Sequence, residues 1–266
     1  MMELCSIASG SSGNCIYAGT DHVHLLVDTG ISKKKIECGL NEIGLKADEI
    51  DGILITHEHS DHVKGLGVMS RKYGIPIYAT AGTIAAIERD GRLGEIDSSL
   101  FHPILPETDF MIGEIAIHPI RTSHDAADPV AYIMKSGDRS VGVITDLGKY
   151  DHSLVDNLSD IDVLLLEANH DVNMLQVGVY PYYLKQRILG DKGHLSNETC
   201  GQLLDEVLHD GIKKILLGHL SKENNYPQLA YETVKMEITM GSSPYKGNDF
   251  PIEIAPRDSL SELITI

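Results

Sequence analysis

The 266-residue chain contains no tryptophan and only three phenylalanines, so tyrosine is its main aromatic residue. Its cysteines are few and lie far apart, without the CxxC spacing of thiolate metal sites or redox pairs. This pattern excludes a disulfide framework and a thiolate zinc site, and we expect the thiols to be buried as small apolar side chains. The four cysteines are Cys5, Cys15, Cys38 and Cys200.

Long apolar runs are also missing. No stretch approaches the roughly 20 residues that a membrane-spanning helix needs. The first residues, MMELCSIASGSSGNC, lack the basic flank and the apolar core of a secretion signal. We therefore expect a cytoplasmic protein without a membrane partner.

Positive charge is scarce, with 22 Lys and Arg against 39 Asp and Glu and a formal net charge of −17. Binding along a nucleic acid requires many phosphates to be neutralised by Lys and Arg, so the balance excludes a protein that coats DNA or RNA. An enzyme that holds a phosphate locally is not excluded. The segment VYPYYLKQR combines tyrosines that suit base stacking with basic residues, although such tyrosines often pack against a core instead. These residues are Tyr180, Tyr182, Tyr183, Lys185 and Arg187.

Short apolar runs alternate with longer helical patterns, which predicts an α/β protein in one domain spanning residues 1–266. Residues 31–43 and 197–209 have the apolar spacing of helices, the second capped by Ser196 or Asn197 and closed by Gly211. The mixture of hairpin-like and alternating segments favours sheets sandwiched by helices over a simple all-parallel sheet. Strands are expected at 2–8, 23–28, 52–56, 75–79, 114–120, 129–135, 139–145, 162–167, 213–218 and 251–255.

The segment ILITHEHSDHVKG places three histidines and an aspartate directly after a strand-like run. Imidazole nitrogens and carboxylate oxygens are ligands of zinc and similar divalent metals. His57 and His59 face the same way if the chain stays extended, while Asp61 and His62 fall on the turn into a helix that begins near Val63. This geometry suits two metal ions better than one.

A site with two metals needs further ligands downstream, and three candidates follow strand-like runs in chain order. These are His124 in IRTSHDA, Asp146 in VGVITDLG and His219 in ILLGHLS. They complete two groups of three residues, joined by one carboxylate that can bridge the two metals. The remaining histidines, at positions 22, 24, 102, 118, 152, 170 and 209, lack this setting and are expected to be structural or exposed.

The HxHxDH motif of His57, His59, Asp61 and His62 resembles the signature of the metallo-β-lactamase fold superfamily, and with the later motifs the resemblance spans residues 5 to about 225. The resemblance implies a four-layer αββα sandwich and two metal sites that share Asp146. It assigns Asp28, at the end of LLVDTG, to support of the histidine loop. The implied ligands are His57, His59, His124 and Asp146 for one metal, and Asp61, His62, Asp146 and His219 for the other.

The residues at the ligand positions separate branches of that superfamily. True β-lactamases usually carry Cys where Asp146 stands, and the oxygen-reducing di-iron members carry Glu where His59 stands, so both are disfavoured. Thioester hydrolases of the glyoxalase type share all seven ligands and stay open. Glu167 in LLLEANHD and His194 in GDKGHLSNE resemble the glutamate and general-acid histidine of the phosphodiesterase branch. A histidine with a carboxylate partner suits protonation of a leaving oxygen near neutral pH.

The segments between the later ligands are too short for the tRNA-clamping arm or for the extra domain of larger nucleases in the superfamily. The motifs ASGSSGN, LVDTG, THEHSDHVKG, LEANHD, GHLSNE and HLSKENN together resemble the YycJ/WalJ family of bacterial proteins over most of the chain. That resemblance implies a DNA exonuclease that acts from the 5′ end and is linked to DNA repair. Its expected cofactors are two divalent ions, zinc or manganese, with iron also compatible.

The implied chemistry is hydrolysis of a phosphodiester bond by a metal-activated water. Asp61 is the expected proton acceptor as well as a ligand, and His194, held by Glu167, is the expected general acid. Two rival classes stay open: a small-molecule hydrolase, such as a cyclic phosphodiesterase or thioesterase, and a non-catalytic metal-binding module. The expected substrate contacts come from SGSSGN and HLSKENN: Ser9, Ser11, Ser12, Asn14, Lys222 and Asn225, with Ser221 and Asn224 beside them.

Overall fold

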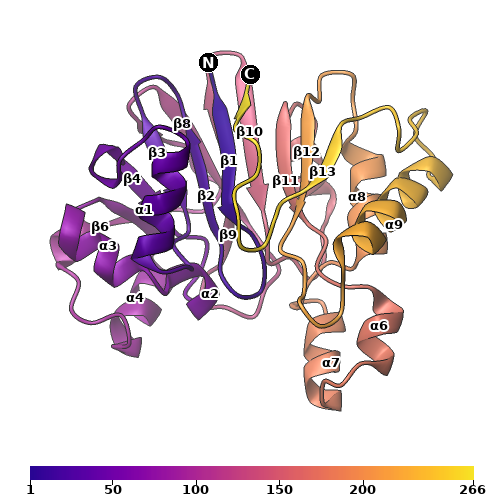
Figure 1. Cartoon of the computed structure of the whole chain (residues 1–266), viewed down its shortest axis with the longest axis horizontal. Helices are drawn as coiled ribbons and strands as arrows, with labels where there is room; N and C mark the ends of the chain where they lie inside the picture. The colour runs from indigo at the N-terminus through magenta and orange to yellow at the C-terminus, as the bar shows by residue number, and fades with distance from the viewer. The chain divides into compact units, whose positions relative to one another are not determined.

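The computed structural model describes residues 1–266, which form two compact units (Figure 1). The first unit contains residues 1–121, 126–141 and 256–266, and the second contains residues 122–125 and 142–255. No helix combines the length and the apolar character needed to cross a bilayer. Both units mix strands and helices, so the predicted α/β class is confirmed.

The first unit is built on a seven-stranded sheet with the order β14-β1-β2-β3-β4-β5-β6. The strands β14, β1, β2 and β3 are antiparallel neighbours, whereas β3 to β6 pair in parallel. Apolar runs such as Leu25–Val27 form these strands because their side chains are buried. The strands are β1 Glu3–Ala8, β2 Cys15–Gly19, β3 His24–Val27, β4 Gly52–Leu54, β5 Ile77–Thr80, β6 Phe101–Ile104 and β14 Ile264–Thr265.

Helices cover this sheet with their apolar stripes. Helix α1 buries Ile36, Gly39 and Leu40, and the Gly39 Cα lies so close to Ile7 that a Cβ there would clash with it. The same unit contains an antiparallel meander of β7 Phe110–Ile112, β8 Ile115–Arg121 and β9 Val130–Ser136. Its helices are α1 Lys33–Glu42, η1 Ala47–Glu49, α2 Ser60–Val63, α3 Leu66–Tyr73, α4 Ala81–Asp90 and η2 Ser98–Leu100.

The second unit contains parallel strands in the order β13-β12-β11, with β10 beside β11. Helices α8 and α9 pack closely, because Gly201 has no side chain and allows the backbone of Val234 to approach. The strands are β10 Arg139–Ile144, which starts in the first unit, β11 Val163–Glu167, β12 Lys214–Gly218 and β13 Ile252–Ile254. The helices are α5 His152–Leu158, α6 Val172–Val177, α7 Tyr182–Leu189, α8 Asn197–Val207 and α9 Pro227–Met240.

All ten predicted strands and both predicted helices are present. Four strands were not predicted: β2, β6, β7 and β14. Each is two to five residues long, and β6 is an edge strand that contains Pro103, so the local sequence signal is weak. Ser196 caps α8 as expected, but Gly211 does not close it. The helix ends at Val207 because Leu208 adopts an extended backbone and donates its N–H to Leu204.

The expectation that every thiol is buried is wrong at one position. Cys5, Cys15 and Cys200 are buried, whereas Cys38 is exposed on α1. Cys38 lies one residue before Gly39, which is on the buried face of α1. The helical rotation per residue therefore turns the Cys38 thiol away from that face. All four cysteines are free thiols.

Candidate metal and phosphodiesterase site

The histidine-rich loop follows β4 in the first unit. The ring centroids of His57 and His59 are 4.5 Å apart, and those of His57 and His62 are 4.1 Å apart. The expectation that His57 and His59 face the same way is therefore confirmed. The helix after the loop begins earlier than predicted, at Ser60, because His59 is extended and its carbonyl accepts the N–H groups of His62 and Val63.

Asp28 supports this loop from the end of β3. Its carboxylate accepts hydrogen bonds from the Thr56 backbone N–H at 2.9 Å and hydroxyl at 2.8 Å, and it lies 2.7 Å from His62 Nδ1. A carboxylate only accepts, so Nδ1 of His62 carries the proton and Nε2 is the atom available to a metal. His62 and Asp28 are both buried, which fixes the ring in this orientation. These contacts agree with the support of the histidine loop that the family resemblance assigns to Asp28.

The loop of Ser9–Asn14 is tied to the same histidines. Asn14 donates its backbone N–H to the Asp61 carbonyl at 2.8 Å, and its amide nitrogen lies 3.2 Å from His62 Nε2. Its amide oxygen accepts from the Gly10 N–H at 2.9 Å. The approach of the two segments requires Gly30, where a Cβ would overlap the Asp61 carbonyl oxygen. Asn14 therefore positions the loop rather than offering a free side chain to a substrate.

In the second unit, Asp146, His219 and His124 follow three different strand ends. Asp146 lies 3.1 Å from His219 Nδ1 through one oxygen and 3.5 Å from His124 Nε2 through the other. The Nδ1 of His124 lies 3.0 Å from the Gly193 carbonyl oxygen, which orients the ring. Burial is the main reason that the pKa of His124 lies below its ordinary value. The neutral form that binds metals is thereby favoured.

Three of these strand-end residues have left-handed backbones. Asp28, Asp146 and His219 have φ angles of 62°, 58° and 53°. Non-glycine residues rarely adopt this conformation, and it concentrates at functional sites, where the surrounding structure holds it. The conformation turns the chain sharply after the strand, so each side chain lies at the edge of the sheet.

Glu167 and His194 form a close pair beside Asp146. The Nδ1 of His194 lies 2.7 Å from Glu167 Oε1, and the other oxygen of Glu167 accepts the backbone N–H groups of Leu147 at 2.9 Å and Leu195 at 3.3 Å. Burial acts to lower the pKa of His194, but the charge and hydrogen bond of Glu167, together with the charge of Asp146, outweigh it and the pKa is raised. The His194 side chain is 15% exposed, so its second nitrogen can reach a ligand.

A set of hydrogen-bonded asparagines holds the strand ends of this unit, a role that we did not predict from the sequence. Asn225 donates to the carbonyls of Ala168 and Asn169 and exchanges hydrogen bonds with Asn197. Asn169 donates to the His219 carbonyl at 2.9 Å. Asn225 is thus fully used within the fold. The local signal is weak, because Asn169 comes two residues after β11, whereas Asn197 starts α8 and Asn225 lies seven residues beyond β12.

His170, which we expected to be structural or exposed, is buried in the same region. Burial lowers its pKa to about 4, so the ring is neutral at pH 7. Among the predicted substrate contacts, Ser11, Ser12 and Lys222 are exposed, whereas Ser9 is buried.

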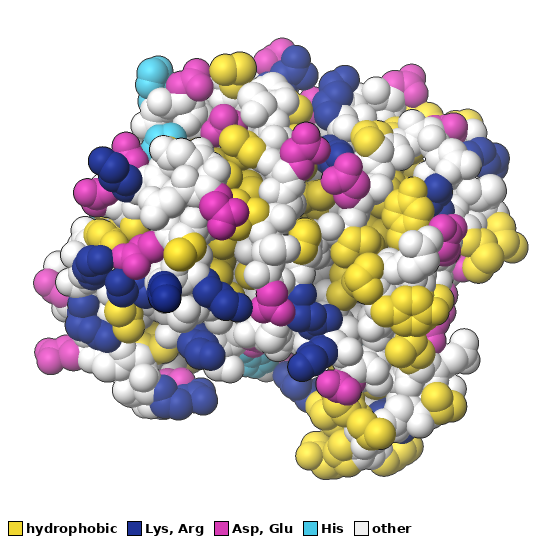
Figure 2. All heavy atoms as spheres, in the orientation of Figure 1, with side chains coloured by type: hydrophobic (Ala, Val, Ile, Leu, Met, Phe, Trp, Pro, Cys, Tyr) yellow, Lys and Arg dark blue, Asp and Glu magenta, His cyan; other side chains and the backbone are white.

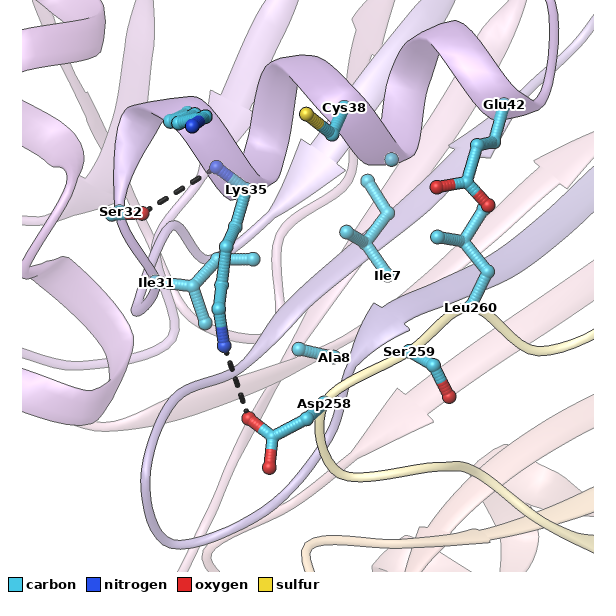
Figure 3. Close-up of a pocket in the computed structure, with 12 residues that line it drawn as sticks. Ile7, Ala8, Ile31, Ser32, Lys35, Cys38, Glu42, Asp258, Ser259 and Leu260 are labelled. Atoms are coloured by element: carbon cyan, nitrogen blue, oxygen red, sulfur yellow. Dashed lines mark hydrogen bonds and ion pairs between the residues drawn. The ribbon is translucent and has the colours of Figure 1, made fainter.

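A separate cavity of about 490 Å³ lies in the first unit between α1 and the C-terminal segment (Figure 3). Ile7, Ala8 and Leu260 give it an apolar lining, and Lys35 reaches Asp258 at 3.1 Å across it. The cavity contains none of the histidines discussed above. It therefore does not belong to the candidate metal site.

The seven predicted ligands are divided between the units, four in the first and three in the second. Asp146, Glu167, His194 and His219 each offer a donor atom, and these atoms lie within 4.8 Å of one another. Nitrogen and carboxylate donors at strand ends fit a divalent metal such as zinc or manganese. The residues present are therefore consistent with a divalent metal site.

Comparison with known families identifies the class of protein. The model of the β-lactamase superfamily domain matches residues 24–219, and the chain belongs to this superfamily. Two relatives match far more of the chain. The protein named exodeoxyribonuclease WalJ from Streptococcus pneumoniae is 43% identical over 98% of this chain and 96% of its own length. Exodeoxyribonuclease YycJ from Bacillus anthracis is 40% identical over 87% of each chain.

Solved structures agree on the fold. The metallo-β-lactamase fold protein YhfI from Bacillus subtilis has a TM-score of 0.68 at 19% identity, over 98% of this chain and 100% of that one. Zinc-bound PqqB from Methylobacterium extorquens has a TM-score of 0.71 at 14% identity, over 98% and 99% of the two chains. The predicted metallo-β-lactamase αββα fold is therefore confirmed.

Proposed function

We propose that the protein is a metal-dependent DNA exonuclease that hydrolyses phosphodiester bonds from the 5′ end. The observation that carries this proposal is the pairing of buried Glu167 with the partly exposed His194, 2.7 Å apart and beside Asp146. Hydrolysis of a phosphodiester must protonate a departing sugar oxygen, and a carboxylate-supported histidine suits that task. Two relatives that align over most of this chain are named exodeoxyribonucleases, which supports a DNA substrate.

We further propose that the seven predicted ligands hold two divalent ions, zinc or manganese, with iron as a further candidate. His57, His59, His124 and Asp146 would hold one ion, and Asp61, His62, Asp146 and His219 the other. When bound, such ions activate a water molecule and stabilise charge on the phosphate. The proposal rests on the donor types, on their places at strand ends, and on the superfamily motif.

The protein's own residues move the protons. We propose that Asp61, in the first turn of α2, accepts a proton from the attacking water. His194 donates a proton to the leaving oxygen from the nitrogen that does not face Glu167. Glu167 holds the ring and keeps the proton on it, because its carboxylate raises the pKa of His194 against the effect of burial.

Among the predicted substrate contacts, we propose Ser11, Ser12 and Lys222 as the side chains that meet the DNA backbone, because they are exposed. Ser9, Asn14 and Asn225 act by shaping the loops. We also retain three further proposals: a single functional domain over residues 1–266, a cytoplasmic location, and a role in DNA repair.

The test is degradation of DNA labelled at its 5′ or 3′ end, single or double stranded, with Mn²⁺ or Zn²⁺. We expect stepwise loss from the 5′ end by the wild type and a strong reduction with His194→Ala. Equal loss from both ends would contradict the polarity. Intact DNA under all conditions, together with turnover of a thioester or a cyclic nucleotide, would replace the exonuclease with a small-molecule hydrolase.

A further inference from the structure

The helical hairpin of α6 and α7 is the most exposed apolar surface of the second unit. Val177, Val179, Tyr182 and Tyr183 are 86%, 88%, 77% and 74% exposed. Figure 1 shows α6 and α7 together beyond α8 and α9, and apolar side chains gather over this part in Figure 2. Monomeric proteins rarely expose such a group without a binding role.

The hairpin also differs from the rest of the chain in charge. Residues 172–190 contain no Asp or Glu, although the whole chain has 39 of them and a net charge of −17. The same stretch contains Lys185 and Arg187, and the guanidinium of Arg187 is paired with Asp125 outside the hairpin. Lys185 donates to the Gln176 carbonyl at 2.7 Å and has no carboxylate partner, so its charge is not neutralised by an ion pair. A segment free of carboxylates removes the repulsion that an acidic protein otherwise presents to phosphate.

The hairpin is anchored to the candidate site at both ends. It begins five residues after Glu167 and ends five residues before His194. Its base is held from the loop after His219, because Asp171 donates its N–H to the Asn224 carbonyl at 3.0 Å. Asn224 also lies against Gly178, at the junction of the two helices. Short, hydrogen-bonded segments therefore connect the hairpin to the proposed general acid, His194.

We propose that the α6–α7 hairpin binds a single-stranded segment of the nucleic acid substrate, with bases stacked on Tyr182 and Tyr183; this rests on the function proposed above. Tyrosine combines a stacking face with a hydroxyl that tolerates water, as single-strand binding requires. Helix α7 has eight residues and is about 12 Å long, enough for roughly three or four nucleotides along one strand. A second copy of the chain would also cover the apolar residues. Dimer formation does not, however, require a surface free of carboxylates, whereas binding of phosphates is favoured by one.

The experiment measures binding of a fluorescent phosphorothioate oligonucleotide, which resists cleavage, to the metal-loaded protein by anisotropy. We expect Tyr182→Ser with Tyr183→Ser to weaken single-strand binding on the order of tenfold to a hundredfold. The double phenylalanine variant, which keeps the rings, should bind like wild type. The matched control is Met236→Ser with Met240→Ser on α9, where the side chains are 52% and 76% exposed. It should also bind like wild type.

Hydrolysis of bis(p-nitrophenyl) phosphate separates this inference from the proposed function. This small substrate has no nucleotide strand to extend along the hairpin, so the double serine variant should keep full turnover with it. Wild-type protein that cleaves neither this substrate nor DNA would contradict the proposed function, whatever the anisotropy shows. A double serine variant that binds and degrades single-stranded DNA like wild type would overturn the hairpin inference alone. Light scattering that shows a wild-type dimer and a monomeric variant of unchanged DNA affinity would assign the hairpin to self-association and also overturn it.

Discussion

Two buried carboxylates, one in each unit, hold a histidine in the same way. Asp28 lies 2.7 Å from His62 Nδ1, and Glu167 lies 2.7 Å from His194 Nδ1. Asp28 also accepts one backbone N–H and Glu167 accepts two, and these bonds fix each carboxylate. The histidines differ in exposure, because His62 is fully buried whereas His194 is 15% exposed.

The difference shows how one structural device serves two purposes. At His62 the carboxylate leaves Nε2 in a closed setting 3.6 Å from Asp61, which suits a fixed metal ligand. At His194 the same contact supports a ring with an open side, which suits proton transfer to a bound molecule. Exposure rather than residue type therefore separates the two proposed roles.

The largest expected effect comes from removing a metal ligand from either unit. His59→Ala or Asp146→Asn should reduce DNA degradation about a thousandfold or more, since the bound ions supply several kcal/mol of transition-state stabilisation. Metal content, measured by elemental analysis, should fall in both variants. Unchanged metal content and turnover in either variant would contradict the ligand set.

Replacing the partly exposed His194 should lower activity without removing metal. His194→Ala should reduce DNA degradation on the order of a hundredfold to ten-thousandfold, as expected for a general acid. The loss should be much smaller with bis(p-nitrophenyl) phosphate, because p-nitrophenolate leaves without a proton. An equal loss with both substrates would assign His194 to another role.

The two supporting carboxylates should give different phenotypes. Asp28→Asn should weaken metal binding tenfold to a hundredfold, measured by competition with a chelator, because the orientation of His62 is lost. Glu167→Gln should leave metal binding closer to wild type. Loss of metal in Glu167→Gln, with none in Asp28→Asn, would contradict the assignment of Asp28 to the metal site and of Glu167 to the general acid.

Glu167→Gln should instead change the pH profile. Since Glu167 raises the pKa of His194 against burial, the acid form of His194 is present below that raised pKa and is lost as pH rises through it. Without the Glu167 charge, burial is opposed only by the charge of Asp146, so the pKa of His194 falls. The basic limb of the pH–rate profile should therefore move to lower pH, and an unmoved limb would mean that another group controls it.

The smallest expected effect concerns the helix that follows His194. Ser196 accepts the Thr199 N–H at 3.1 Å at the start of α8, so Ser196→Ala should lower the free energy of unfolding by about 1 kcal/mol. Ser32 makes a longer, exposed bond of 3.4 Å at the start of α1, and Ser32→Ala should cost less. Urea denaturation measures both, and a larger loss with Ser32→Ala would contradict the ranking.

The sequence predicted most of the candidate site because its residues follow buried strands. His57 to His62 are contiguous, and His124, Asp146, Glu167 and His219 each come directly after an apolar run or a few residues beyond it. The sequence did not predict the structural roles of Asn14 and Asn225, because these roles depend on contacts between distant segments. The hydrogen bonds of Asn14 to Asp61, and of Asn225 to Asn197, join residues far apart in the chain, so both side chains looked available to a substrate.

The short strand β14 has a consequence for the colloidal behaviour of the protein. Thr265 and Ile264 pair with Glu3 and Leu4 and so cover the first part of the outer edge of β1. Without these residues, β1 would be the edge strand of the sheet. An apolar edge strand with unpaired backbone groups is a template onto which strands of other molecules can add. Two residues of pairing thus protect the first unit from edge-to-edge aggregation.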